Sequence, residues 1–204
     1  MSYRATVRMM HSGSSDLIGE GKSGQPDKVG HGGALKKPIP PLVLIEYERR
    51  DQHHLCSSLE LLADQLPERV DGHLCESIYE KLRFDLPVYH RNEEALYLLI
   101  GRNVPPLLKV SPILEYVRKE HAIHNCYADE LYEPLQELRT GSDIQNSDTI
   151  GYMLRCCFET MRRHLEWEDL TLMPLAGRCL TAEDQTQLSK TLAKNRKDIG
   201  LNTV

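Results

Sequence analysis

Two histidines interrupt the apolar stripe of a predicted long helix, and this feature constrains the fold more than any other. From Ser111-Pro112, a favourable helix start, to about Gly141, one helical face advances in alternating steps of three and four residues. The residues on that face are Leu114, Val117, His121, His124, Ala128, Leu131, Leu135 and Leu138. Both histidines stand where packed helices are normally apolar, so the fold must give them partners.

A second predicted helix, residues 148–175, repeats the pattern. Its inward face reads Ile150, Leu154, Cys157, Met161, His164, Glu168, Leu172 and Leu175. A third, residues 72–100, is expected to place His90 and Glu94 on one face. Residues four apart lie one above the other on a helix, so each His-x-x-x-Glu pair can direct both side chains to one point.

Buried carboxylates and imidazoles without partners are costly, and a metal ion would resolve that cost. A single His-x-x-x-Glu pair is usually a solvated surface pair or a buried hydrogen bond. Two such pairs with a third histidine between them favour a metal site formed by His90, Glu94, His121, His164 and Glu168. Ligands without thiolate suit iron or manganese, zinc remains an alternative, and two carboxylates suggest a bridged pair of ions.

The remaining pattern predicts an all-α protein. Another long helix is expected over residues 42–66, before Pro67, and a short C-terminal helix over residues 182–193. Four long segments joined by short connections predict an antiparallel four-helix bundle, with the short fifth helix, over residues 38–196. Prolines 87 and 134 are expected to kink or interrupt their helices.

The two ends of the chain are expected to lie outside the bundle. Residues 1–37 are rich in glycine and serine and lack apolar periodicity, so they predict a flexible tail. Residues 197–204 are expected to form a short C-terminal tail.

Composition excludes several classes of protein. A net charge of −5 argues against binding nucleic acid, which needs a basic face. No apolar run is long enough to span a bilayer, and no signal segment opens the chain, so we expect a cytoplasmic protein. The six cysteines contain no C-x-x-C pair, which argues against a zinc ribbon.

Several motifs together resemble the hemerythrin-like (HHE cation-binding) family over about residues 40–195. They are Asp85-Leu86-Pro87 leading into His90 and Glu94, Arg118-Lys119-Glu120-His121, His164 to Glu168 running into Met173-Pro174-Leu175, and the ending Leu180 to Asp184 with Leu188-Ser189. The resemblance implies two non-haem iron ions bridged by carboxylates and an oxo or hydroxo group. It makes His90, His121 and His164 terminal ligands, and Glu94 and Glu168 the bridging carboxylates.

The first helix departs from this family. Members usually carry a histidine after an acidic residue near its middle, and that position falls on Arg49 here. A guanidinium cannot bind a metal ion. We expect His53, one turn further on, to complete the site. An open position or a contribution from His124 remains an alternative, and His54 is expected to be exposed.

The charge of Arg49 needs a partner close to bound cations. We expect Arg49 either to turn toward carboxylates at the end of the bundle or to pair with a ligand such as Glu94.

The resemblance implies a site that meets dioxygen, nitric oxide or peroxide, in oxygen binding, redox sensing or oxidant response. Fold and metal do not choose among these. Binding or sensing is favoured over turnover. One alternative is an iron-centre repair enzyme or a peroxide- or nitric-oxide-reactive enzyme, although the first cysteine is Cys56, inside the bundle. Another is a metal-free helical interaction module. The protein partner is left open.

Overall fold

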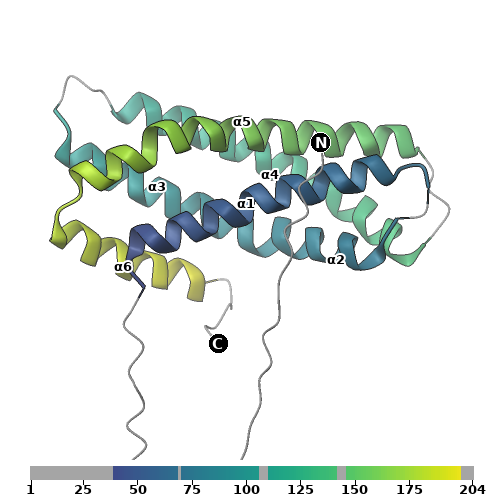
Figure 1. The fold of residues 1–204 in the computed structure, drawn as a ribbon, viewed down its shortest axis with the longest axis horizontal. Helices are drawn as coiled ribbons and strands as arrows, with labels where there is room; N and C mark the ends of the chain where they lie inside the picture. The colour runs from purple at the N-terminus through teal and green to yellow at the C-terminus, as the bar shows by residue number, and fades with distance from the viewer. Residues whose placement is uncertain (1–38, 69, 106–109, 142–145, 199–204) are drawn as a thin grey trace, which may run out of the picture. The chain divides into compact units, whose positions relative to one another are not determined.

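The computed structural model describes residues 39–68, 70–105, 110–141 and 146–198. Every regular element within these ranges is a helix, as Figure 1 shows, so the all-α prediction is confirmed. None of these helices has the length and apolar character needed to cross a membrane. The predicted N-terminal tail lies outside the described residues, as does most of the predicted C-terminal one.

Helix α1 (Pro41–Gln65) has proline at its start, where the missing N–H costs nothing, and it ends just before Pro67. The predicted bounds, 42–66, are confirmed to within one residue. Its buried face is apolar at both ends but polar in the middle, where Glu48, Arg49 and Gln52 are buried. A helix that buries three such residues must find partners for them on its neighbours.

The predicted segment 72–100 is one helical run with an irregular turn. Helix α2 (Gly72–Glu80) is capped by Asp71, whose side chain accepts a hydrogen bond from the His73 N–H at 2.9 Å. A wide π-turn, η1 (Lys81–Asp85), leads into α3 (Leu86–Asn103). Pro87 lacks an N–H, and the irregular turn comes directly before it. The disturbance predicted near Pro87 is therefore confirmed.

Helix α4 (Val110–Thr140) buries all eight residues predicted for its inner face, from Leu114 to Leu138. It continues through Pro134, so the break considered there does not occur. Helix α5 (Ser147–Cys179) buries seven of the eight predicted positions. The exception is Leu175, half-buried, beside which Ala176 is buried.

Helix α6 (Ala182–Lys197) is longer than the predicted 182–193. Thr181 accepts a hydrogen bond from the Asp184 N–H, and the Asp184 carboxylate accepts one from the Thr181 N–H. This reciprocal pair is the capping box that the sequence indicates. The helix packs against α1 and α3.

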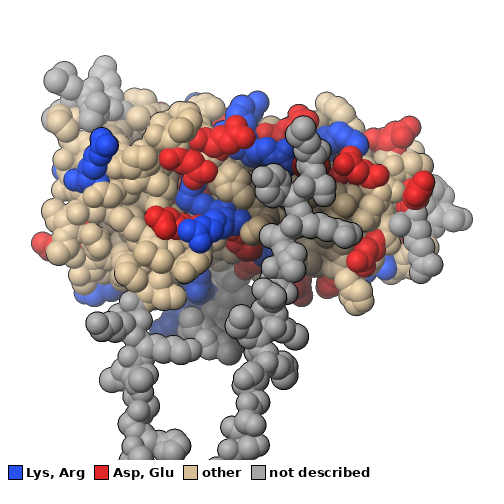
Figure 2. Space-filling model, viewed as in Figure 1, with Lys and Arg blue, Asp and Glu red and all other residues tan. Residues whose placement is uncertain are grey.

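The long helices lie side by side along their length (Figure 1), with α1 against α5 and with α2 and α3 against α4. Exposed ion pairs link α1 to α5, such as Arg162 with Glu60 at 2.7 Å and Arg155 with Asp64 at 3.2 Å. On the face shown in Figure 2, acidic and basic side chains are interspersed. Each exposed pair adds little stability, so the interior carries the packing.

Two apolar clusters fill that interior, and each of α1, α3, α4 and α5 contributes to both. One cluster contains Leu55, Leu86, Ala128 and Leu165. The other contains Ile45, Leu96, Val117 and Leu172. Buried polar residues lie between these positions on every one of the four helices, for example His121 between Val117 and Ala128 on α4. The candidate site is therefore a polar layer between two apolar ones.

Candidate metal centre

Four buried side chains from three helices converge in the polar layer: Glu93 of α3, His121 of α4, and His164 and Glu168 of α5. Each offers one ligand atom, and the four atoms lie within 4.8 Å of one another. Imidazole nitrogens and carboxylate oxygens bind a transition metal at about 2.0–2.2 Å, so donors on one ion lie within about 4.4 Å of each other. Small side-chain movements would bring all four onto one ion.

Many buried polar atoms of this layer make no hydrogen bond in the described part of the chain. They include both ring nitrogens of His90 and His164, Nε2 of His121 and His124, Oε2 of Glu93 and Oε1 of Glu168. Folded proteins leave few such atoms, because each unsatisfied group costs about 1–3 kcal/mol. A metal ion would satisfy several at once, so the residues present fit a metal.

Each of the two carboxylates faces an imidazole with one oxygen and α1 with the other. Glu93 Oε2 lies 3.3 Å from His121 Nε2, and its Oε1 accepts a hydrogen bond from Gln52 Nε2 at 2.7 Å. Glu168 Oε1 lies 3.4 Å from His164 Nε2, and its Oε2 pairs with Arg49 Nη1. One oxygen of each carboxylate is thus directed to the cluster and one is held by α1.

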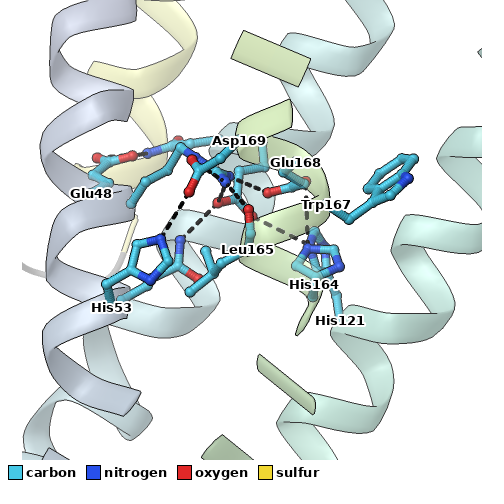
Figure 3. Close-up of polar contacts among 12 residues, drawn as sticks. Glu48, His53, His121, His164, Leu165, Trp167, Glu168 and Asp169 are labelled. Atoms are coloured by element: carbon cyan, nitrogen blue, oxygen red, sulfur yellow. Dashed lines mark hydrogen bonds and ion pairs between the residues drawn. The ribbon is translucent and has the colours of Figure 1, made fainter. Parts of the chain in front are cut away.

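Arg49 lies inside this layer and is surrounded by acceptors. Its Nη2 donates to the Leu165 carbonyl at 2.7 Å and its Nε to Asp169 Oδ1 at 2.9 Å; Figure 3 shows Leu165, Glu168 and Asp169 gathered on this side. Burial acts to lower the pKa of Arg49, but the carboxylates of Glu168, Glu93 and Asp169 raise it. Arg49 therefore pairs with a predicted ligand, Glu168, and not with Glu94.

Glu94 lies at the edge of the layer. Its side chain is 25% exposed, and its Oε2 accepts a hydrogen bond from Arg118 Nε at 3.0 Å. The predicted face advances in steps of four residues, from Leu86 through His90 and Glu94 to Leu98. Each step turns about 40° beyond a full turn, so the later residues rotate away from the core. Leu98 is accordingly 49% exposed. The structure places Glu93 in the cluster, a residue that an alternation of four and three after His90 would have selected.

Glu94 nevertheless contacts the cluster through His121. Its Oε1 lies 3.2 Å from His121 Nδ1, and since a carboxylate can only accept, Nδ1 carries the proton. Burial acts to lower the pKa of His121, but the adjacent carboxylates of Glu93 and Glu94 raise it to about 9. A carboxylate on the far nitrogen is the usual support of a metal-binding histidine, because it orients the ring and fixes its tautomer.

His53 lies outside the cluster. Its side chain is 39% exposed, and its Nε2 lies 3.0 Å from Asp169 Oδ2. Figure 3 draws this contact as a dashed line. Gln52, the preceding residue, faces Glu93 instead, because successive residues of a helix point about 100° apart. The sequence pattern alone does not indicate the contacts of Gln52 and Asp169. His54 is exposed, as predicted.

His90 and His124 complete a group of four packed imidazoles. The His90 ring stacks on His121 with centroids 4.0 Å apart, and the His124 centroid lies 5.2 Å from that of His164. Burial lowers the pKa of both, that of His124 to about 3. Both rings are thus neutral, the form that binds a metal.

A second buried network adjoins the site. The Glu48 carboxylate accepts hydrogen bonds from Asn92 Nδ2 at 2.9 and 3.0 Å and from Arg196 Nη2 at 3.2 Å. Asn195 donates to the Asn92 oxygen at 2.9 Å. Burial is the main cause that raises the pKa of Glu48 to about 7. Through these contacts α6 is tied to the two helices that carry Arg49 and Glu93.

Comparison of the chain with protein-family models, with curated proteins and with solved structures gives no match. The candidate metal centre is therefore defined by the geometry of its four donors alone.

Proposed function

We propose that this chain is a hemerythrin-like protein that holds non-haem iron in its core and uses it to bind or sense a small molecule. The observation that carries the proposal is the convergence of four buried donors, Glu93, His121, His164 and Glu168, with ligand atoms that make no hydrogen bond among the described residues. Imidazole with carboxylate and no thiolate suits iron or manganese, with zinc as the alternative.

The order of the apolar clusters supports the antiparallel four-helix bundle that this proposal includes. Along α1 and α4 the chain passes from the cluster of Ile45 and Val117 to that of Leu55 and Ala128. Along α3 and α5 it passes in the opposite direction, from Leu86 and Leu165 to Leu96 and Leu172. The packed pairs α1 with α5 and α3 with α4 thus run in opposite directions.

In this proposal the protein's own residues hold the ion, orient its ligands and exclude water. Glu93, His121, His164 and Glu168 bind it, and Glu94 holds the Nδ1 proton of His121 so that Nε2 faces the ion. The two apolar layers keep water from the centre. Bound iron would supply the affinity for dioxygen, nitric oxide or peroxide.

A pocket at one end of the bundle offers a side of approach for a small molecule. It has a volume of about 380 Å³ and lies where α3 ends and α4 begins, with Tyr97, Val104 and Leu114 in its lining. Tyr97 and Leu114 belong to the apolar cluster that contains Ile45, so the pocket lies against the apolar layer on that side of the polar one.

The buried cysteines favour binding over thiol-dependent repair chemistry. Burial raises the pKa of both Cys56 and Cys157 to about 12, so neither carries a thiolate at neutral pH. Both belong to the apolar cluster that also contains Leu55. These two cysteines therefore contribute to apolar packing. In this proposal the metal centre is the reactive part of the core.

The test is the metal content of the full chain, expressed with ample iron and purified without a metal-affinity tag. Iron retained through dialysis against a weak chelator, with a visible absorption that nitric oxide changes, is the expected result. Retained zinc or manganese would support the proposed metal site but contradict the assignment of iron to it. No retained or rebound metal would overturn the proposal and favour a metal-free interaction module.

A further inference from the structure

We infer that the centre binds a single metal ion and that the guanidinium of Arg49 stands in for a second cation. The inference rests on the proposed metal-binding function and changes its stoichiometry from the two ions that the family resemblance implies. Arg49 is 2% exposed and contacts both carboxylates of the cluster, as an ion pair with Glu168 and at 3.6 Å from Glu93 Oε1.

The oxygens of the two carboxylates are divided between the cluster and α1. A carboxylate that bridges two ions gives one oxygen to each. In this chain one oxygen of Glu168 is occupied by Arg49, and one oxygen of Glu93 accepts from Gln52 at 2.7 Å. The oxygens that remain, Glu168 Oε1 and Glu93 Oε2, both face the imidazoles of His164 and His121. Each carboxylate therefore has one oxygen to offer, which suits one ion.

The charge of Arg49 also opposes a second ion. Its guanidinium pairs with Glu168 and lies 3.6 Å from Glu93 Oε1, beside the oxygens that a second ion would need. A cation at that position would be repelled by the guanidinium, and burial strengthens this repulsion. The place that Arg49 holds is therefore unfavourable for a second ion.

Arg49 is also fixed in place by its contacts with α5. Its Nη2 donates to the Leu165 carbonyl, and its Nε to Asp169, whose other oxygen lies 3.0 Å from His53 Nε2. All three nitrogens of the guanidinium thus have partners on α5. Turning the side chain away to admit a second ion would break these contacts and leave a buried cation without a counter-charge, a costly change.

The experiment titrates the metal-free full chain with Mn²⁺ and Zn²⁺ by isothermal calorimetry, beside electron paramagnetic resonance of the Mn²⁺ samples. We expect about one ion per chain and the spectrum of an isolated Mn²⁺ ion. Two ions per chain with a spin-coupled Mn²⁺ spectrum would overturn the inference and leave the proposed metal function intact. No binding of either ion would overturn both.

Variants at position 49 test the cause. Arg49→His frees the second oxygen of Glu168 and adds an imidazole, so it should raise the stoichiometry from about one ion to about two per chain. Arg49→Met frees the oxygen without adding a ligand, and removing the charge should lower the Kd of the first ion at least about tenfold. Arg50→His, at the exposed neighbouring position, is the matched control and should stay at one ion.

Arg49→Lys is the folding control, because it keeps the buried positive charge at position 49. It should fold by circular dichroism and remain at one ion. An Arg49→His variant that folds and still binds one ion would show that Arg49 does not exclude the second. An unchanged Kd in a folded Arg49→Met would show that its charge does not oppose the ion.

Discussion

The two sides of the polar layer differ in whether their buried polar groups have hydrogen-bond partners. On the side formed by α4 and α5, several buried ring nitrogens and one carboxylate oxygen have no hydrogen-bond partner among the described residues. They belong to His121, His124, His164 and Glu168. The side formed by α1 presents Arg49 and Gln52, which are donors and already satisfied. One side needs an ion and the other supplies a fixed positive charge. The site therefore depends on the balance between them.

The largest expected effect comes from Glu168, where the two sides meet. Glu168→Ala removes a metal ligand and leaves the buried Arg49 without its closest counter-charge. Breaking a buried ion pair typically costs about 3–5 kcal/mol. We expect that loss in urea unfolding of the metal-free chain, together with loss of metal binding. Glu166→Ala, at an exposed position of the same helix, should change neither. Equal metal content in wild type and Glu168→Ala would remove Glu168 from the ligands.

The α1 side should respond to pH through Glu48. Burial raises its pKa to about 7, above the 4.5 of an unperturbed glutamate. Its contribution to stability is thus fully present below pH 4.5 and is lost as pH rises through 7. Glu48→Gln does not titrate, so the variant should gain up to about 3 kcal/mol relative to wild type between pH 4.5 and 8. Urea unfolding of both proteins across that range measures it, and parallel pH profiles would contradict it.

On α3, adjacent glutamates allow the two roles to be separated. Glu93→Gln removes a ligand and should abolish tight metal binding. Glu94→Gln removes only the carboxylate on His121 Nδ1, and such outer partners typically contribute about 10–100-fold in metal affinity. Mn²⁺ titration of both variants measures the difference. If Glu94→Gln proves the more damaging of the two, the assignment of ligand and supporting residue is reversed.

The smallest effect is expected at the outer edge of the α1 side. His53→Ala loses only its partly exposed contact with Asp169, which should change stability by about 0–1 kcal/mol and leave metal binding intact. His54→Ala, at an exposed position, is its control. Loss of metal in His53→Ala alone would make His53 a ligand, as the sequence analysis expected, and would require α1 to rearrange when the ion binds.

The sequence predicted the α4 and α5 faces well because their apolar and polar residues follow the alternating steps of a regular helix. His121, His124, His164 and Glu168 were found in this way. Arg49 was correctly placed on the inner face of α1, four residues after Ile45. Its partners could not be predicted, because Leu165 and Asp169 are more than 100 residues away in the chain. Only packing of α1 on α5 reveals them.

On α3 the predicted face and the buried cluster differ by a single residue. His90 is buried, as expected, but continuing in steps of four predicts Glu94, whereas the buried cluster contains Glu93. The four-residue periodicity is real as far as His90, since Ile78, Leu82, Leu86 and His90 are all buried at steps of four. In a regular α-helix these four residues would be spread over an arc of about 120°.

The π-turn Lys81–Asp85 explains that run and has a further consequence. A π-turn is equivalent to one inserted residue, which absorbs the angular drift of successive four-residue steps. It therefore sets the angular phase of α3 relative to α2. Deleting one residue there, such as the partly exposed Phe84, would restore a regular helix and rotate His90 and Glu93 by about 100° relative to Cys75 and Ile78. The core of α2 and the ligands of α3 can face the same interior only while that extra residue is present.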